Sequence, residues 1–328
     1  MAAIIKIELA LGFLCSVSHS IMPNSADSPP VAIVGAGAVG SALGRGLVAC
    51  GYRVEAVLNR TRESAQALAD RVGASVAAAS VDALPADVRL VLVCVPDDAI
   101  SDVAEALAAL DHAWPDTIVA HTAGAKTAAV LDPLAERGAA TMSFHPMQTF
   151  APDTSPEAFE GIVVGLEGVP RALAAGETLA HALGAKPVRL TAEEKARYHC
   201  AAALASNGLV ALLSVVEEVF GTDRANETSA AVDLVGPLVK RTWANLEEGT
   251  PEGVLTGPVA RGDVETVQAH IDALRTATPH LVPLYAALST EMVRVAVRGG
   301  HLAPGLAEAL LALLREATDE GAEPESDG

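Results

Sequence analysis

Short apolar runs alternate with longer amphipathic stretches up to about residue 190. The run Val31–Val34 contains no polar residue, which is typical of a parallel strand that is buried on both faces. The stretch 38–50 that follows has apolar residues at helical spacing and ends at Gly51. Strands that alternate with helices in this way indicate βαβ units and a parallel sheet. The same pattern predicts strands at 53–58, 89–95, 117–120, 139–144, 162–165 and 187–190, and helices at 62–72, 97–110 and 170–183.

The pattern changes at Thr191. From there to Arg315 the apolar positions follow long helical periods, and no strand is evident. Thr191 and Glu194 have the spacing of a capping box, which begins a helix. We therefore predict an α/β fold, a Rossmann doubly wound parallel sheet at 31–190 followed by an all-α C-terminal domain at 191–315. The helical domain would contribute substrate contacts and dimer contacts.

The two ends of the chain are expected to lie outside these domains. Residues 1–30 are predicted to be a leader, in which a mostly apolar segment is interrupted by Lys6 and Glu8 and has no basic segment before it. We expect translation to start at Met22, with a secretory signal or lipid anchor and an ordered helix as the alternatives. Residues 316–328 are acidic and predict a disordered tail.

The composition of the chain argues against several kinds of ligand and location. The formal net charge is −19 and no basic cluster interrupts the acidity, which argues against nucleic acid. The 4 cysteines form no C-x-x-C pair and no His/Cys group has zinc spacing, so we expect no metal and a reducing compartment. No segment after the leader has ~20 uninterrupted apolar residues. We therefore predict a cytoplasmic protein without a membrane span.

A glycine-rich turn follows the first predicted strand and opens the first predicted helix. The motif G-x-G-x-x-G has predictive weight in this context, because the helix start presents free amide groups and a positive dipole end to a pyrophosphate. The first glycine permits a tight turn, the second lets the cofactor approach, and the third lets helix and strand pack. The predicted cofactor-binding residues are Gly35, Gly37, Ala38, Val39 and Gly40.

The end of the second predicted strand indicates which nicotinamide cofactor is preferred. NAD-binding proteins usually carry a carboxylate there for the ribose 2′-hydroxyl. This chain instead has Asn59, Arg60 and Thr61. Arg60 could make charge-assisted hydrogen bonds to a 2′-phosphate, and Asn59 and Thr61 could add neutral ones. The sequence therefore predicts NADP as the cofactor.

Further candidate residues for cofactor binding and catalysis follow the later strands. The carboxyl ends of strands face the ligand crevice in such sheets, so we expect Val95, Pro96, His121 and Ala123 to line the nicotinamide side. His145 comes just after another strand and is followed by a proline. Reduction of a carbonyl needs a proton donor, and a histidine of near-neutral pKa suits that role, although it could also merely cap the strand.

The helical domain offers a second group of candidates. Lys195, His199 and Ser206 fall at i, i+4 and i+11, within a narrow stripe of one helix, and Asn207 is close to His199. Lys195 and Asn207 are catalytic candidates beside His145, while His199, Ser206 and Arg261 are candidates for substrate binding. Arg261 could pair with a carboxylate. Solvated surface positions are the alternative for Lys195, Asn207 and Arg261.

Taken in order, these segments resemble the bacterial Rossmann-like proteins that carry a C-terminal helical domain of unknown function. The resemblance includes Tyr198–Ala202, Ser206-Asn207 and Gly257–Asp263 and covers about residues 30–315. Proteins of this kind are similar to pyrroline-5-carboxylate reductase, prephenate dehydrogenase, deazaflavin-dependent NADP reductases and β-hydroxyacid dehydrogenases. The segment that begins at His145 resembles the His-Pro turn of prephenate dehydrogenase, in which the histidine contacts the reacting oxygen. This resemblance implies the same role for His145. In β-hydroxyacid dehydrogenases an asparagine stands four residues after the catalytic lysine, where this chain has His199.

The resemblance implies a homodimer joined through the helical domains. Together with the motifs, it leads us to expect NADP(H)-dependent reduction of a small anionic 2-oxo acid or related carbonyl, with 2-ketopantoate as one candidate because some family members are thought to act as an alternative ketopantoate reductase. Two alternatives stay open. One is reduction of a cyclic imine acid, as in pyrroline-5-carboxylate reductase. The other is a non-catalytic NADP(H)-binding sensor or regulator.

Overall fold

The computed structural model describes residues 29–151, 153–221 and 231–319. It divides into two compact units, Met1–Ala203 and Leu204–Gly328, which we treat separately. The expectations for the leader up to residue 28, including the start at Met22, lie outside the described residues, as does the end of the acidic tail.

The first unit contains an eight-stranded sheet with the order β3-β2-β1-β4-β5-β6-β7-β8. The strands β1 to β6 are parallel, whereas β7 is antiparallel to β6 and parallel to β8. The strands are β1 (Val31–Val34), β2 (Val54–Leu58), β3 (Val76–Ala78), β4 (Leu90–Val93), β5 (Ile118–His121), β6 (Ala140–Pro146), β7 (Val163–Gly168) and β8 (Lys186–Arg189). The helices between them are α1 (Ala38–Ala49), α2 (Arg62–Val72), α3 (Ile100–Ala108), α4 (Asp132–Glu136) and α5 (Pro170–Ala182).

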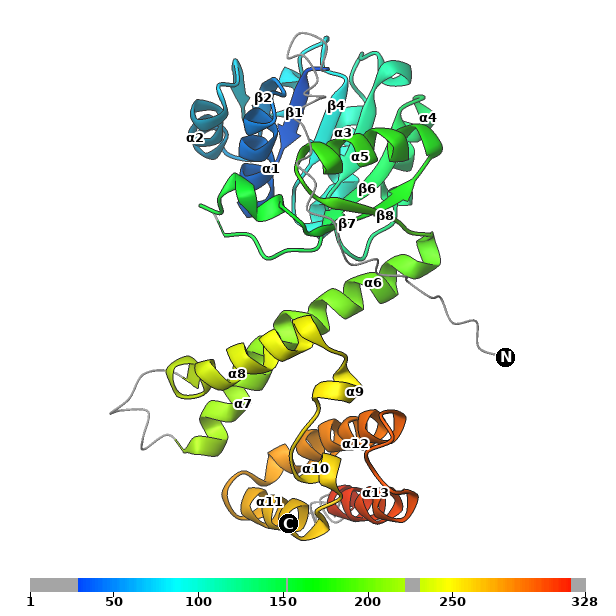
Figure 1. Cartoon of the computed structure of the whole chain (residues 1–328). Helices are drawn as coiled ribbons and strands as arrows, with labels where there is room; N and C mark the ends of the chain where they lie inside the picture. The colour runs from blue at the N-terminus through cyan, green and yellow to red at the C-terminus, as the bar shows by residue number, and fades with distance from the viewer. Residues whose placement is uncertain (1–28, 152, 222–230, 320–328) are drawn as a thin grey trace, which may run out of the picture. The chain divides into compact units, whose positions relative to one another are not determined.

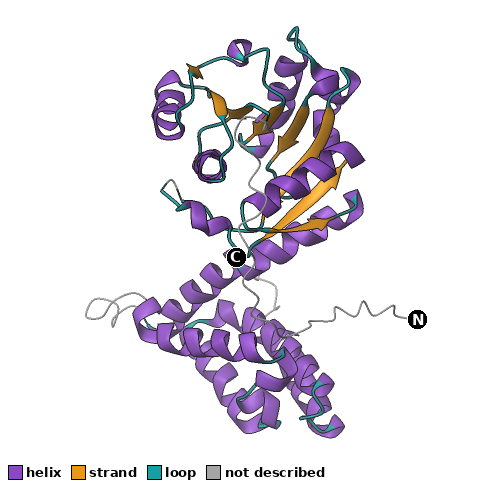
Figure 2. Ribbon diagram, turned by 45° about the horizontal axis from the view of Figure 1, so that its top comes forward, coloured by secondary structure: helices purple, strands orange, loops and turns teal. Residues whose placement is uncertain are grey.

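Helices cover both faces of this sheet (Figures 1 and 2). Because side chains alternate along a strand, Val31 and Ile33 enter one core, with α1, α2 and α5, while Ala32 and Val34 enter the other, with α3 and α4. Both cores consist mainly of buried aliphatic residues, which explains why strands such as β1 and β4 contain no polar residue. The predicted Rossmann-type sheet is confirmed.

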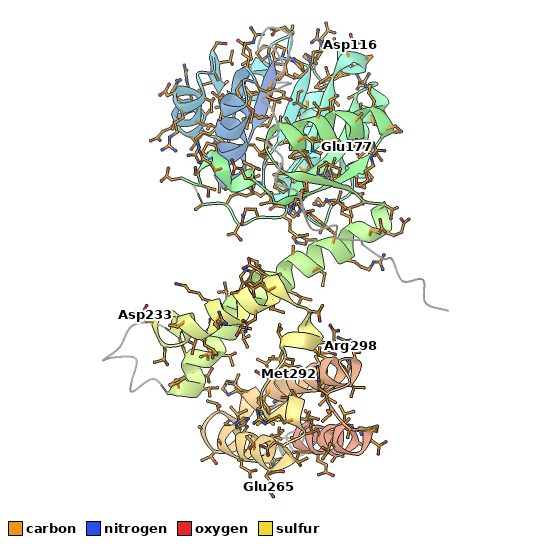
Figure 3. All side chains as sticks on the ribbon, viewed as in Figure 1. Asp116, Glu177, Asp233, Glu265, Met292 and Arg298 are labelled. Atoms are coloured by element: carbon orange, nitrogen blue, oxygen red, sulfur yellow. The ribbon has the colours of Figure 1, made fainter. Side chains whose placement is uncertain are left out.

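Two features of the sheet were not evident from the pattern. The strand β3 has three residues, all half-buried, so its apolar run is too short to be distinguished from a loop. The reversal of β7 leaves no signature in a short apolar run, because such a run has the same pattern in either direction. Glu177 of α5, labelled in Figure 3, fixes the end of β8 by accepting hydrogen bonds of 2.6 and 2.9 Å from Arg189.

The remainder of the described chain is helical, as predicted. Helix α6 (Ala192–Ala205) begins in the first unit and reaches the division between the units. The second unit has a core formed mainly by α11, α12 and α13 around Val267, Ile271, Val293 and Leu310. Its helices are α7 (Asn207–Phe220), α8 (Ala231–Glu248), α9 (Pro251–Val254), α10 (Pro258–Arg261), α11 (Val264–Ala277), α12 (Val282–Arg298) and α13 (Pro304–Asp319).

The helical region departs from the sequence predictions at two places. The helix expected to run on from Lys195 is divided at Ser206, which precedes α7 with φ −103° and ψ −70°. The interruption is one residue long, and Ser206 itself keeps backbone angles in the right-handed helical region. Residues 316–319, which were expected to belong to the disordered tail, are instead the end of α13, and Ala317 is buried in the core of the second unit.

One apolar feature is left outside these cores. Within the part of the chain that the structure describes, the run Ala192–Phe220 is long and apolar enough to cross a membrane, with a mean hydropathy of 1.7 in its most apolar window and none of that window buried. No such segment was predicted from the sequence, because no run after the leader has ~20 uninterrupted apolar residues.

Candidate active site

The glycine-rich turn lies at the carboxyl end of β1, between the ends of β2 and β4. Gly35 has φ +105°, and a Cβ there would lie 2.5 Å from the carbonyl oxygen of Cys94, so only glycine fits. A Cβ at Gly40 would collide with the carbonyl oxygen of Gly35. At Gly37 a Cβ would have no neighbour within 4 Å, which leaves open space in front of the helix start.

This open space fits a pyrophosphate. Helix α1 has no acidic residue in its first turn, and the first amide groups of a helix, here those that follow Gly37 at Ala38 and Val39, have no acceptor within the helix. These amides and the helix dipole favour an anion. Glycine is thus sterically required at Gly35 and Gly40, and the turn leaves room for the phosphates of a dinucleotide at Gly37.

Asn59 fastens the turn to the end of β2. Its Oδ1 accepts a hydrogen bond of 3.2 Å from the amide of Ala36, and its Nδ2 donates to the hydroxyl of Thr61 at 3.3 Å. Thr61 in turn donates to Ser64 at 2.9 Å. The side chains of Asn59 and Thr61 thus form hydrogen bonds within the protein, and these bonds stabilise the conformation of the turn.

Two exposed arginines stand at the same edge. Arg60 follows β2 directly, and Arg62 is the first residue of α2. In the described part of the chain, no carboxylate forms an ion pair with either guanidinium. Both can reach an anion without first breaking a salt bridge, which suits a ribose 2′-phosphate. Arg62 was not among the residues predicted from the sequence, although it lies only two positions after Arg60.

His121 ends β5 and is completely buried. Its Nδ1 accepts a hydrogen bond of 3.1 Å from the amide of Ala123, so its Nε2 carries the proton and donates to the carbonyl of Thr127 at 3.1 Å. Burial lowers its pKa to about 4. Both ring nitrogens are therefore committed to shaping the turn after β5. Any contact with a ligand here comes from the backbone of this turn rather than from the imidazole.

Lys195 is the most unusual residue of this edge, because its charged side chain is only 1% exposed. Its Nζ donates to the carbonyl oxygens of Ala123 at 2.9 Å and Gly124 at 2.8 Å. No carboxylate in the described residues lies within salt-bridge distance, although Glu167 and Asp97 exert a weaker attraction. An ammonium group has three donors, and two are used here. The third remains for another acceptor.

The rings of His145 and His199 both lie against Gly124. A Cβ at Gly124 would collide with Nδ1 of His199 and lie 2.9 Å from Nε2 of His145. The two rings meet edge to face with centroids 5.6 Å apart. The Nδ1 atoms of both rings are buried without a hydrogen-bond partner in the described protein. Buried polar atoms are normally paired, so this pair is suited to receive a ligand or water.

The pKa values of His145 and Lys195 show which of the two side chains is charged near neutral pH. Burial is the main reason that the pKa of His145 is lowered to about 4, and the Lys195 ammonium adds to the effect. His145 is therefore neutral at pH 7, which differs from the near-neutral pKa expected from the sequence. Burial also lowers the pKa of Lys195, to about 8. Of these two groups, only Lys195 carries a transferable positive charge near neutral pH.

The predicted residues do not all fall in one unit. The first unit brings His145, Lys195 and His199 together, next to the turn of Ala123. After β4, Val95 is half-buried and Pro96 is exposed. The other three candidates are Ser206, Asn207 and Arg261, which are exposed residues of the second unit.

Two family models match the chain. A Rossmann-like domain model matches residues 23–146, and a model described as a domain of unknown function, DUF2520, matches residues 162–292. The predicted resemblance to Rossmann-like proteins with a C-terminal domain of unknown function is confirmed. No curated protein matches the chain.

Several solved structures have a similar fold. A protein from Thermotoga maritima is 26% identical, with a TM-score of 0.66, over 82% of this chain and 98% of that chain. A protein from Bacteroides fragilis, named provisionally as an NADP oxidoreductase, is 24% identical, with a TM-score of 0.66, over 81% of this chain and 98% of that one. A reductive aminase from Aspergillus terreus, in complex with NADPH and ethyl levulinate, is 20% identical, with a TM-score of 0.55, over 90% of this chain and 95% of that one.

Proposed function

We propose that this chain, in which a Rossmann-like domain is joined to a DUF2520 domain, is an NADP(H)-dependent oxidoreductase that reduces a small carbonyl compound. The observation that carries the proposal is the burial of Lys195 at the edge where the glycine-rich turn lies. A buried ammonium without a close carboxylate is costly, and a protein that only binds a cofactor has no need of one.

The glycine-rich turn would hold the cofactor through the amides at the start of α1, with Arg60 and Arg62 at the 2′-phosphate. Support comes from the named complex of the A. terreus reductive aminase with NADPH and from the absence of a carboxylate at Asn59–Thr61. The bound nicotinamide would supply the hydride. Val95, Pro96 and the backbone at His121 and Ala123 would contact its ring side.

Lys195 would supply the proton. Reduction of a carbonyl leaves negative charge on oxygen, and the third N–H of the Lys195 ammonium can donate to that oxygen. Neutral His145 can donate or accept a hydrogen bond and so orient the same oxygen, but it cannot stabilise the developing charge as a cation. Because its pKa is about 8, Lys195 is largely protonated at pH 7 and becomes a stronger acid than an exposed lysine.

The charge of Lys195 also favours a carbonyl over an imine. An imine is reduced as its protonated cation, which a buried ammonium would repel. A neutral carbonyl that carries a carboxylate elsewhere is attracted instead. We therefore keep a small 2-oxo acid as the substrate class, with 2-ketopantoate as one member to be assayed. His199, which lies in the same unit as Lys195 and His145, would contact its carboxylate or another polar group. The roles expected of Ser206, Asn207 and Arg261 in substrate binding stay predictions.

The assay that tests this proposal follows NADPH oxidation with a panel of 2-oxo acids and cyclic imine acids, alongside NADPH binding. We expect turnover with a 2-oxo acid and its loss in Lys195→Met, while NADPH still binds. Turnover confined to imines that survives Lys195→Met would favour the imine reductase. Tight NADPH binding without turnover on any compound would favour the sensor.

We also propose that the protein is a cytoplasmic homodimer formed through its helical unit. Helices α7 and α8 pack on each other, yet no residue of α7 is buried. Apolar side chains such as Val210 on α7 and Leu238 on α8 are 69% and 68% exposed. A second copy explains them better than a membrane, because the apolar run Ala192–Phe220 is divided at Ser206 and its start is tied to the first unit by Lys195. Gel filtration with light scattering would measure the mass.

A further inference from the structure

Tyr198 of α6 connects the helix to the strand that carries His145. Its hydroxyl donates to the backbone carbonyl of His145 at 3.1 Å and accepts a hydrogen bond of 3.1 Å from the amide of Gly165. His145 of β6 and Gly165 of β7 are opposite each other in the antiparallel pair. The hydroxyl therefore stands where the two strands face each other, at the level of the candidate catalytic histidine.

Gly165 leaves the space for this side chain. A Cβ at Gly165 would lie 2.8 Å from Cζ of Tyr198 and 2.9 Å from Cε1. Gly165 is not among the glycines with positive φ, so its backbone conformation does not require glycine. The close approach of the Tyr198 ring does require it. The same ring meets the imidazole of His145 edge to face, with centroids 5.6 Å apart.

Tyr198 belongs to one short segment of α6 that faces the edge of the sheet. Three residues before it, Lys195 is bonded to the turn at Ala123 and Gly124. One residue after it, the His199 ring lies against Gly124. Side chains three positions apart on a helix share a face. The Tyr198 hydroxyl is thus a second polar link between the same face of α6 and the sheet, beside the Lys195 ammonium.

We propose that Tyr198 is a positioning residue, whose hydroxyl holds the end of β6 against α6 and so fixes the imidazole of His145 relative to the ammonium of Lys195. The inference rests on the proposed roles of these two groups. Tyr198 acts through them, because its hydroxyl is already engaged with two backbone groups. Burial raises the pKa of Tyr198 to about 12, so the phenol remains a donor throughout the neutral range.

The kinetic test is Tyr198→Phe, which keeps the ring and removes the hydroxyl. A small displacement of catalytic groups can reduce turnover by up to about 100-fold, so we expect kcat to fall by roughly 10- to 100-fold. KM and NADPH affinity should change little. The matched control is Tyr285→Phe in the second unit, because the Tyr285 hydroxyl also bonds to a histidine, His270, at 2.8 Å. An equal fall of kcat in both variants would overturn the proposal.

A second readout requires no turnover. Histidine ring signals followed by NMR during a pH titration report the pKa of His145 in the protein without ligands. We expect this pKa to rise from about 4 toward the ordinary value in Tyr198→Phe, because the imidazole would move out of its buried place beside Lys195. The same rise is expected in Gly165→Ala, which keeps the hydroxyl but displaces the ring.

These readouts separate two kinds of failure. If the native protein turns over no substrate, the proposed function fails, while a raised His145 pKa in either variant still establishes the positioning role. If the His145 titration is unchanged in Tyr198→Phe and in Gly165→Ala, Tyr198 does not position the ring, whatever the enzyme does. Should Tyr198→Phe not fold, Gly165→Ala decides the question.

Discussion

Two regions of the helical part have an unusual distribution of polar and apolar side chains. The start of α6 buries a charge, whereas α7 and α8 expose apolar residues. Lys195 places a charged side chain in the interior at 1% exposure, whereas Leu238 and Trp243 of α8 leave large apolar side chains in solvent at 68% and 64%. Each arrangement is unfavourable for an isolated folded chain. A buried charge indicates chemistry at that position, and a large exposed apolar surface indicates a partner.

The largest expected effect concerns the buried charge. Lys195→Met keeps the length of the side chain and removes both the ammonium and its cost of burial. We expect kcat to fall by about 10²- to 10⁴-fold, which is typical of losing a general acid. Thermal unfolding serves as the folding control, because the carbonyls of Ala123 and Gly124 lose their donor while the cost of burying the charge is removed. Full activity in Lys195→Met would make Lys195 a structural tether only.

At the exposed apolar surface of α7 and α8 the informative change is to add a charge, whereas at Lys195 it is to remove one. Leu238→Glu introduces a carboxylate on α8, where a contact with a second copy would bury it. The loss of one buried leucine contributes about 1.5–3 kcal/mol, so the dimer should dissociate at least about 10-fold more readily. Analytical ultracentrifugation measures this shift, with Glu248→Gln, an exposed residue at the end of the same helix, as the control. A monomeric native protein would contradict the homodimer.

A smaller effect is expected on stability in acid. The pKa of His121 is about 4 when folded and near 6.5 when unfolded, so the unfolded chain binds more protons between these values. Stability is therefore lost as the pH falls from 6.5 toward 4. Between pH 7 and pH 5 the loss is about 2 kcal/mol for this ring. Denaturant titrations should show less loss in His121→Gln, and an equal loss would mean that His121 is not the cause.

The pH dependence of turnover sharpens the assignment of the proton donor. Because Lys195 must be protonated, kcat/KM should decline as the pH rises through about 8, the pKa of this lysine. Protonation of His145 below about 4 lies outside the usual assay range. A profile that is flat through pH 8 but falls below pH 6.5 would instead assign the proton transfer to a histidine.

The sequence was informative wherever local pattern determines structure. Buried strands such as Val31–Val34, and the glycines of the turn, follow from local periodicity and spacing. The reversal of β7, the division of the helix at Ser206 and the neutral state of His145 do not. Each depends on groups that are distant along the chain: His145 is neutral because residues of β5 and α6 surround it, and Tyr198 reaches Gly165, which lies 33 positions earlier.

All the roles proposed for this unit depend on binding of NADP(H) at the edge of the sheet, through the start of α1 and Arg60. Calorimetric titration of the protein and of Arg60→Ala with NADPH and NADH measures this binding. A charge-assisted contact contributes about 1.5–3 kcal/mol, so Arg60→Ala should weaken NADPH binding by roughly 10- to 100-fold and leave NADH binding nearly unchanged. An equal change for both cofactors would contradict the role of Arg60, and no binding heat with either cofactor would contradict the account as a whole.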